Sequence, residues 1–451
     1  MGQTSLNKYS FVKVVHDVID LTMDNIPLVQ VSKSIEVETI SYTDENKKRK
    51  CPFYKRIPGT TFTMDAFSFG EISGCTGYFL SHFHSDHFGG LRKKFNQKLY
   101  CSQITANLVK LRIGVDDEYI VPLPLNSPID VQGITVTLID ANHCPGSVVF
   151  IFKVPASKIN KTFASYRLTN IDLTIVHTGD FRAHPRMLDQ MPKTVDFLFL
   201  DTTYLDPKHV FPDQSFVIRK ISNIICDAIY NSGIESDFVR PVKKQKITKN
   251  QTRLSFGQAL PPVVKAPKNP FIITAEDSIL IAIGSYTIGK EKIALHLAKL
   301  LSSKIYLNAE KTKLWRTFMC DNVNKFMSDD INSQVHVLRM NEINYKFLDS
   351  YLEKTKYTKV IGISPTGWTF GSNEWAPSTV SKHILIYSIP YSEHSSYSEL
   401  KDFTTRLNPV KVQPTVGMNK VPEQLELIKT WRPNKTKWEI ENDLFLGKSI
   451  A

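Results

Sequence analysis

The sequence predicts an α/β fold in which several strands end at polar residues on one edge of a sheet. Three apolar stretches are typical of strands and each is followed by ionisable residues: Ile134–Asp140, Leu173–His177 and Phe197–Leu200. A fourth, Phe79–Ser81, runs directly into a histidine cluster. A fifth, Ile279–Ile283, is followed by a glycine-containing turn and a helical pattern over Glu291–Leu301. Strands interleaved with helices in this way indicate an α/β protein.

Length and composition narrow the class of protein. The 451 residues allow two or three domains, each with its own core. The net charge of +12 favours association with polyanions, of which nucleic acid is the commonest inside cells. We find no apolar run of about 18 residues, so we expect no membrane span. The beginning of the chain lacks a secretory signal pattern.

The six cysteines are widely separated, and none forms a CxxC pair. This spacing favours reduced thiols in an intracellular protein and argues against a structural zinc finger.

Residues 1–50 are polar and lack periodicity, so we expect a mostly disordered arm. Within it, the stretch Val18–Thr22 is prone to form a strand and resembles motifs that add to the sheet edge of SUMO. The basic cluster Lys47–Lys50 is typical of a nuclear localisation signal. A chance apolar patch and a solvated run of charge explain these two features equally well.

A second polar segment spans about 232–270. It holds eight lysines and arginines but only two acidic residues, Glu235 and Asp237, together with several prolines. We interpret it as a flexible basic loop. A solvated insertion is favoured over direct contact with nucleic acid.

The sequence His82-Phe83-His84-Ser85-Asp86-His87 concentrates groups that bind metals. Imidazole is a preferred zinc ligand, and a carboxylate can complete the site. In an extended segment, His82 and His84 point to the same side. A turn after them would present Asp86 and His87 to a neighbouring point. The stretch can therefore supply two ligands to each of two adjacent metal positions. A surface polar cluster is the disfavoured alternative.

Further motifs follow the cluster in an informative order. Asp65 in FTMDAF, the histidine cluster, His143 in ANHCPG and Asp180 in HTGDFR together resemble the metallo-β-lactamase superfamily. Three more residues resemble the extra motifs of its β-CASP branch, which acts on nucleic acids: Asp201 in LDTTY, His394 in PYSEHSSY and Val416 in PTVG. The segments CPFYKRIPGT, ANHCPGS, HTGDFR, PTGWT and IPYSEHSSY are most similar to the nitrogen-mustard-sensitivity nucleases of DNA interstrand-crosslink repair. The resemblance covers about residues 51–432.

This resemblance implies a metallo-β-lactamase αββα sandwich with an inserted β-CASP α/β cap. The first part of the sandwich would span 51–206, the cap 207–381, and the C-terminal part of the sandwich 382–451. One zinc ion would be held by His82, His84, His143 and Asp180. A second metal position would use Asp86, His87 and the bridging Asp180. Val416 stands where RNA-processing members usually carry a histidine, so we expect a weaker second site and a DNA substrate.

The resemblance also implies a role for each of these residues in phosphodiester hydrolysis. The metal would activate water, Asp86 would orient the nucleophile, and Asp65 would support the histidine loop. His394 is the candidate general acid for the leaving 3′-oxygen, because an imidazole can donate a proton near pH 7. Asp201 would orient His394 or a histidine ligand. We interpret Cys144 as a buried small residue and neither His177 nor His184 as a ligand.

The segment Gly284–Glu291 fits the P-loop pattern GxxxxGK. Glu291 replaces the Ser or Thr that would bind magnesium, which disfavours a nucleotide hydrolase. Because a glycine-rich helix N-terminus binds phosphate well, we expect a DNA phosphate, such as a 5′-terminal one, at four residues: Ser285, Lys290, Ser392 and Ser395. The alternative is that the glycines only shape a tight turn.

The combined prediction is a zinc-dependent 5′-to-3′ DNA exonuclease of interstrand-crosslink repair, nuclear, monomeric and unconnected with membranes. One zinc ion would be firmly bound, with a second metal left open. An RNA-processing endonuclease of the same fold is disfavoured by Val416. A non-catalytic scaffold that recruits repair partners is disfavoured by the intact ligand set. The cap segment disfavours a small-molecule lactamase or thioesterase.

Overall fold

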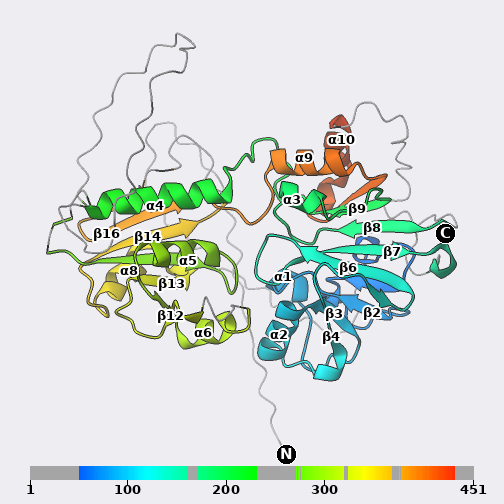
Figure 1. Ribbon diagram of the computed structural model, residues 1–451, viewed down its shortest axis with the longest axis horizontal. Coiled ribbons are helices and arrows are strands. Elements are labelled where there is room, and N and C mark those ends of the chain that lie inside the picture. Colours follow the sequence, from blue (N-terminus) through cyan, green and yellow to red (C-terminus); the bar gives the residue numbers. More distant parts are fainter. Residues whose placement is uncertain are drawn as a thin grey trace, which may run out of the picture. The chain divides into compact units, whose positions relative to one another are not determined.

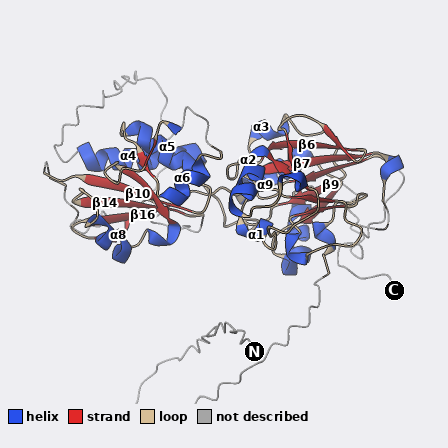
Figure 2. Cartoon of the chain, turned by 90° about the horizontal axis from the view of Figure 1, so that it is seen from below, coloured by secondary structure: helices blue, strands red, loops and turns tan. Residues whose placement is uncertain are grey.

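The computed structural model describes residues 50–160, 162, 171–230, 271, 273–274, 276–318, 324–367, 375 and 377–431. The predicted SUMO-binding stretch, the basic cluster except Lys50, and the whole of the basic loop lie outside these residues. The described chain contains three sheets with helices on their outer faces, which confirms the α/β class (Figure 1; Figure 2). Within this part of the chain, no helix is both long and apolar enough to cross a membrane.

Two sheets form the sandwich. The first is wholly parallel and has the order β1 (Phe62–Met64), β2 (Gly77–Phe79), β3 (Leu99–Ser102) and β4 (Ile120–Leu123). The second has the order β17 (Lys411–Pro414), β9 (Phe197–Leu200), β8 (Leu173–His177), β7 (Val148–Val154), β6 (Ile134–Asp140) and β5 (Ile129–Val131). Strands β6, β8 and β9 have the bounds that the sequence predicts.

The alternation of side chains along these strands builds the layers, because successive residues point to opposite faces. Phe79 on β2 packs with Phe150 and Phe152 on β7 between the two sheets. Its neighbour Tyr78 faces the other way, into a cluster with helix α2 (Gln103–Arg112). On the far side, the second sheet packs against α3 (Pro185–Leu188), α9 (Tyr397–Leu407) and α10 (Val421–Thr430). The order helix, sheet, sheet, helix confirms the αββα sandwich.

The third sheet is the predicted cap. Its order is β12 (Met327–Ser328), β11 (Ile305–Tyr306), β13 (Val335–Arg339), β10 (Ile279–Ser285), β14 (Lys359–Pro365), β16 (Ile384–Ile389) and β15 (Pro377–Val380). All pairs are parallel except that of β15 with β16. One face packs against α4 (Gln214–Tyr230) and α5 (Glu291–Leu300) and the other against α8 (Tyr345–Leu352). Helix α6 (Ala309–Trp315) contributes Trp315 to the first of these cores.

One predicted boundary needs correction. We expected the chain to return to the sandwich at residue 382. Strand β16 instead pairs with β14 in the cap sheet, with Val360 opposite Ile384, so the return begins after Ile389. An apolar run identifies a buried strand, but it does not say which sheet the strand joins.

Candidate metal centre

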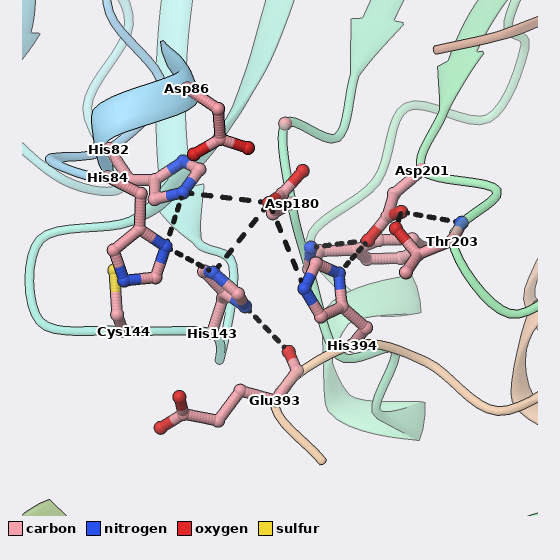
Figure 3. A network of polar contacts seen from close by, with 12 residues as sticks. His82, His84, Asp86, His143, Cys144, Asp180, Asp201, Thr203, Glu393 and His394 are labelled. Carbon is pink, nitrogen blue, oxygen red and sulfur yellow. Dashed lines mark hydrogen bonds and ion pairs between the residues drawn. The ribbon is translucent and has the colours of Figure 1, made fainter. Parts of the chain in front are cut away.

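The ends of strands deliver the side chains of the site, as the sequence predicts. The segment after β2 carries His82 and His84 and leads into the short helix α1 (Ser85–Phe88). The loops after β6, β8 and β9 carry His143, Asp180 and Asp201. His394 arrives from the segment that leaves the cap after β16. Figure 3 shows these side chains pointing toward one another.

Four of these residues bring their ligand atoms together. His84 Nδ1 lies 3.0 Å from His82 Nε2 and 3.1 Å from His143 Nε2. Asp180 Oδ2 lies 3.7 Å from His82 Nε2 and 3.9 Å from His143 Nε2. Ligands at zinc distances in a tetrahedral site are about 3.3 Å apart. The donor atoms therefore fit a metal ion.

The three histidines also have the right protonation state. Burial lowers the pKa of His84 and holds that of His82 and His143 well below the usual range, so all three are neutral. Their outer nitrogens contact protein oxygens: Ser81 Oγ at 3.0 Å from His82, the Ile288 carbonyl at 3.3 Å from His84 and the Glu393 carbonyl at 2.8 Å from His143. With a proton on each outer nitrogen, the lone pairs of the inner ones face the cluster.

A second group surrounds His87. Its Nε2 lies 3.2 Å from Asp180 Oδ2, and its Nδ1 donates to Asp65 Oδ2 at 2.7 Å. Burial opposes the charged imidazole, but these two carboxylates outweigh it and raise the pKa of His87 well above the usual range. The position therefore favours a cation, either a proton or a metal ion. His82, His87 and Asp180 are close enough together to hold a metal.

Asp65 and Asp86 have different surroundings. Asp65 is buried and also accepts from the Ser81 backbone and hydroxyl, both at 2.8 Å. The side chain of Asp86 is 76% exposed, with Oδ2 at 3.5 Å from His87 Nε2. Asp65 thus anchors the histidine loop from within, whereas the side chain of Asp86, labelled in Figure 3, is open to solvent.

His394 lies beside the cluster and is held by Asp201. His394 Nδ1 donates to Asp201 Oδ2 at 2.8 Å, and its Nε2 lies 3.9 Å from Asp180. Burial opposes the charge on His394, but Asp201 outweighs it and raises the pKa of His394 to about 9. Asp201 is itself fixed by the backbone and hydroxyl of Thr203. His143, Asp180 and His394 form a third group that could hold a metal.

The four residues expected to bind phosphate form hydrogen bonds and ion pairs within the protein. Ser285 is buried, donates to the Gly289 carbonyl at 3.0 Å and accepts from Lys311 at 3.2 Å. Ser392 bonds within the turn to His394, while Ser395 donates to the Phe181 carbonyl. Buried hydroxyls with such partners stabilise the loops, and phosphate binding by the serines stays a prediction.

Lys290, the fourth residue expected to bind phosphate, contacts a carboxylate of the same chain. Its Nζ lies 3.3 Å from Glu393 Oε2, and its backbone N–H donates to Glu393 Oε1 at 2.7 Å. The Gly289 N–H donates to Glu291 Oε1 at 2.7 Å. The helix N-terminus does attract an anion, but the anion is the carboxylate of Glu393 from the same chain.

Two residues that sequence reasoning missed hold the site together. Glu393 joins the start of α5 through its carboxylate and orients His143 through its carbonyl. Arg182 is buried, pairs with Glu399 at 2.9 Å and donates to the Ser392 carbonyl at 2.8 Å. Both stand inside motifs that the sequence singled out, HTGDFR and PYSEHSSY, but their partners lie far away along the chain.

The other residues that the sequence singled out make contacts within the protein. Cys144 is buried among the ligands, and burial raises the pKa of its thiol well above the usual range. His177 accepts from the Gly179 N–H at 3.1 Å, and burial lowers its pKa to about 3. His184 caps α3 at the surface. The Val416 carbonyl accepts from Thr202 at 2.9 Å.

Comparisons with known proteins agree with this geometry. Residues 68–221 match the family model described as "Beta-lactamase superfamily domain", and residues 320–420 match "DNA repair metallo-beta-lactamase". The chain is 38% identical to human "DNA cross-link repair 1A protein" over 88% of its own length and 33% of the relative's. It is 36% identical to "DNA cross-link repair protein SNM1" of Arabidopsis thaliana over 82% of its length and 66% of the relative's.

A more distant relative is "5' exonuclease Apollo" of Danio rerio. The identity is 27%, over 80% of this chain and 52% of the relative. The chain thus spans 33% of the human cross-link repair protein and 52% of the exonuclease.

Proposed function

Because the chain belongs to the DNA repair metallo-β-lactamase family, we propose that it is a zinc-dependent 5′-to-3′ exonuclease that hydrolyses DNA in interstrand-crosslink repair. The observation that supports this proposal best is the convergence of His82, His84, His143 and Asp180 beside the His394–Asp201 pair. The net charge of +12 suits a polyanionic substrate.

The proposed zinc ligands are His82, His84, His143 and Asp180, with His87, Asp86 and the shared Asp180 around a second position. Bound zinc supplies a Lewis acid and lowers the pKa of a coordinated water. Buried neutral imidazoles next to a carboxylate suit this ion. Val416 offers no ligand atom, which supports a weaker second position.

The protein's own groups perform the proton transfers. With a pKa of about 9, His394 carries a proton at neutral pH. Its Nδ1 is held by Asp201, so Nε2 faces the cluster and donates its proton to the leaving 3′-oxygen. Asp86, exposed at the rim, is placed to orient the attacking water. Asp65 keeps His87 in position.

Matched single-stranded DNA and RNA, each labelled at the 3′ end and made with and without a 5′ phosphate, test the proposal. We expect progressive shortening of the 5′-phosphorylated DNA from its 5′ end. His82→Ala should abolish the activity and lower the zinc content measured by mass spectrometry, while circular dichroism stays unchanged. Exposed His184→Ala, at the start of α3, is the matched control and should retain both activity and zinc.

Each alternative predicts a different result. Internal cuts confined to RNA would support an RNA-processing endonuclease. Absence of cleavage by the zinc-loaded protein, with DNA repair partners still bound, would support a scaffold. Full activity of His82→Ala would contradict the metal assignment.

Nuclear localisation and SUMO binding belong to the same proposal. They depend on Lys47–Lys50 and Val18–Thr22. Alanine substitution of the basic cluster should move a fluorescent fusion out of the nucleus, and substitution of Ile19 and Leu21 should remove binding to SUMO. We expect light scattering to give the mass of a monomer.

A further inference from the structure

Tyr286 is an exposed aromatic residue beside the metal centre. It lies in the loop between β10 and α5, and 55% of it is exposed. Two residues later in the same loop, the Ile288 carbonyl lies 3.3 Å from His84 Nε2. Two residues of extended chain span at most about 7 Å. The backbone of Tyr286 therefore lies within roughly one nucleotide's length of the residues that contact the metal cluster.

The loop holds Tyr286 firmly. Its carbonyl accepts from Lys311 Nζ at 2.6 Å. Lys290 Nζ stands over the ring, 5.6 Å from its centroid, and is itself paired with Glu393. A bound base would order few additional groups here, because the backbone is already fixed.

Lys290 connects the Tyr286 ring to the segment that carries His394, because its Nζ lies 5.6 Å from the ring centroid and 3.3 Å from Oε2 of Glu393, which precedes His394 in the chain. The Tyr204 ring packs edge-on to His394, with centroids 5.9 Å apart. Tyr204 is buried, whereas Tyr286 is open to solvent. Of these two tyrosines, Tyr286 is therefore the one that a substrate can reach.

We propose that Tyr286 is a stacking platform for a nucleobase of the nucleotide that adjoins the scissile phosphate. An aromatic ring stacks on any base, so this contact binds DNA without reading its sequence. Lys290, whose ammonium is paired with Glu393, stands over the ring and helps to hold it in place. The inference rests on the proposed DNA nuclease function and names a binding residue for it.

Single-turnover and steady-state kinetics on 5′-phosphorylated single-stranded DNA test this contact. One substrate carries a base at every position. The others carry a single abasic nucleotide at the first, second or third position from the 5′ end. For wild type, we expect one of these abasic positions to raise KM by roughly tenfold, the effect of losing one stacked base. Tyr286→Ala should raise KM for ordinary DNA to a similar extent, with little change in kcat, and should no longer respond to that abasic position.

Tyr286→Phe should keep wild-type KM because it keeps the ring. Tyr345→Ala is the matched control, since Tyr345 is 48% exposed at the start of α8 in the cap. It should leave KM unchanged. Anisotropy binding of the same oligonucleotides in a chelator separates stacking from catalysis.

Three outcomes would overturn the platform: an unchanged KM in Tyr286→Ala, the same abasic response in that variant as in wild type, or a failure of DNA to bind. Wild-type binding that depends on Tyr286 without any cleavage would retain the platform and contradict the proposed nuclease.

Discussion

At the residue scale, Asp201 decides whether His394 carries a proton. Burial alone would favour the neutral ring, but the carboxylate at 2.8 Å raises the pKa of His394 to about 9. The pKa of His394 in the folded protein exceeds its unfolded value of about 6.5. The pair with Asp201 therefore contributes its full stabilisation of the fold below about pH 6.5. The contribution is lost as pH rises through about 9.

Asp201→Asn tests this pair. Without the carboxylate, burial dominates and the pKa of His394 falls, so the alkaline limb of the pH–rate profile should move to lower pH. At pH 7.5 we expect the rate to drop by about 100-fold, the lower end of the usual contribution of a general acid. The measurement is kcat against pH. Exposed Asp206→Asn is the control, and an alkaline limb that stays in place in Asp201→Asn would contradict the role of His394.

At the element scale, the loop before α5 joins the cap to the metal centre. Glu393 accepts from the Lys290 backbone there and orients His143 with its carbonyl. Gly289 makes this approach possible, since its φ is +106° and an added Cβ would lie 2.6 Å from Glu393 Oε2. The glycine that resembles part of a P-loop is therefore needed for a contact within the protein.

Gly289→Ala should displace Glu393 and strain the backbone. We expect a loss of about 1–3 kcal/mol in the free energy of unfolding, measured by denaturant titration, together with a clear fall in activity because His143 loses its orienting carbonyl. Gly70→Ala is the control, as Gly70 also has a positive φ but an added Cβ there meets nothing within 4 Å. It should lose stability with little change in activity. Equal losses of activity in both variants would count against the link through Glu393.

At the scale of the whole molecule, the metal cluster joins segments that are far apart in the sequence. His82 follows a strand of the first sheet, whereas His143 and Asp180 follow strands of the second. An ion bound among them binds the folded state only, so it should stabilise the entire sandwich.

Chelation should therefore lower the melting temperature of the wild-type protein. Zinc at 100 times its dissociation constant adds about 2.7 kcal/mol of stability, so we expect a shift of several degrees in differential scanning calorimetry that added zinc reverses. His82→Ala should lack the shift, and His184→Ala should keep it. A melting temperature unaffected by chelator in wild type would show that metal does not stabilise this cluster.

The sequence by itself determined the strands that lead to the site and the types of residue at their ends. The bounds of β6, β8 and β9 follow from apolar runs closed by polar residues, and the order of the motifs indicated the superfamily. These signals are local, because side-chain periodicity and ligand chemistry act over a few residues.

Only the tertiary structure decided which groups meet across the chain. It assigned β16 to the cap sheet, gave the serines protein partners and left Asp86 exposed. It also placed the carboxylate of Glu393 at the N-terminus of α5, where it accepts from the backbone N–H of Lys290, 103 residues away in the sequence. A helix N-terminus attracts any anion, and sequence spacing does not reveal whether a phosphate or a carboxylate of the same chain packs against it.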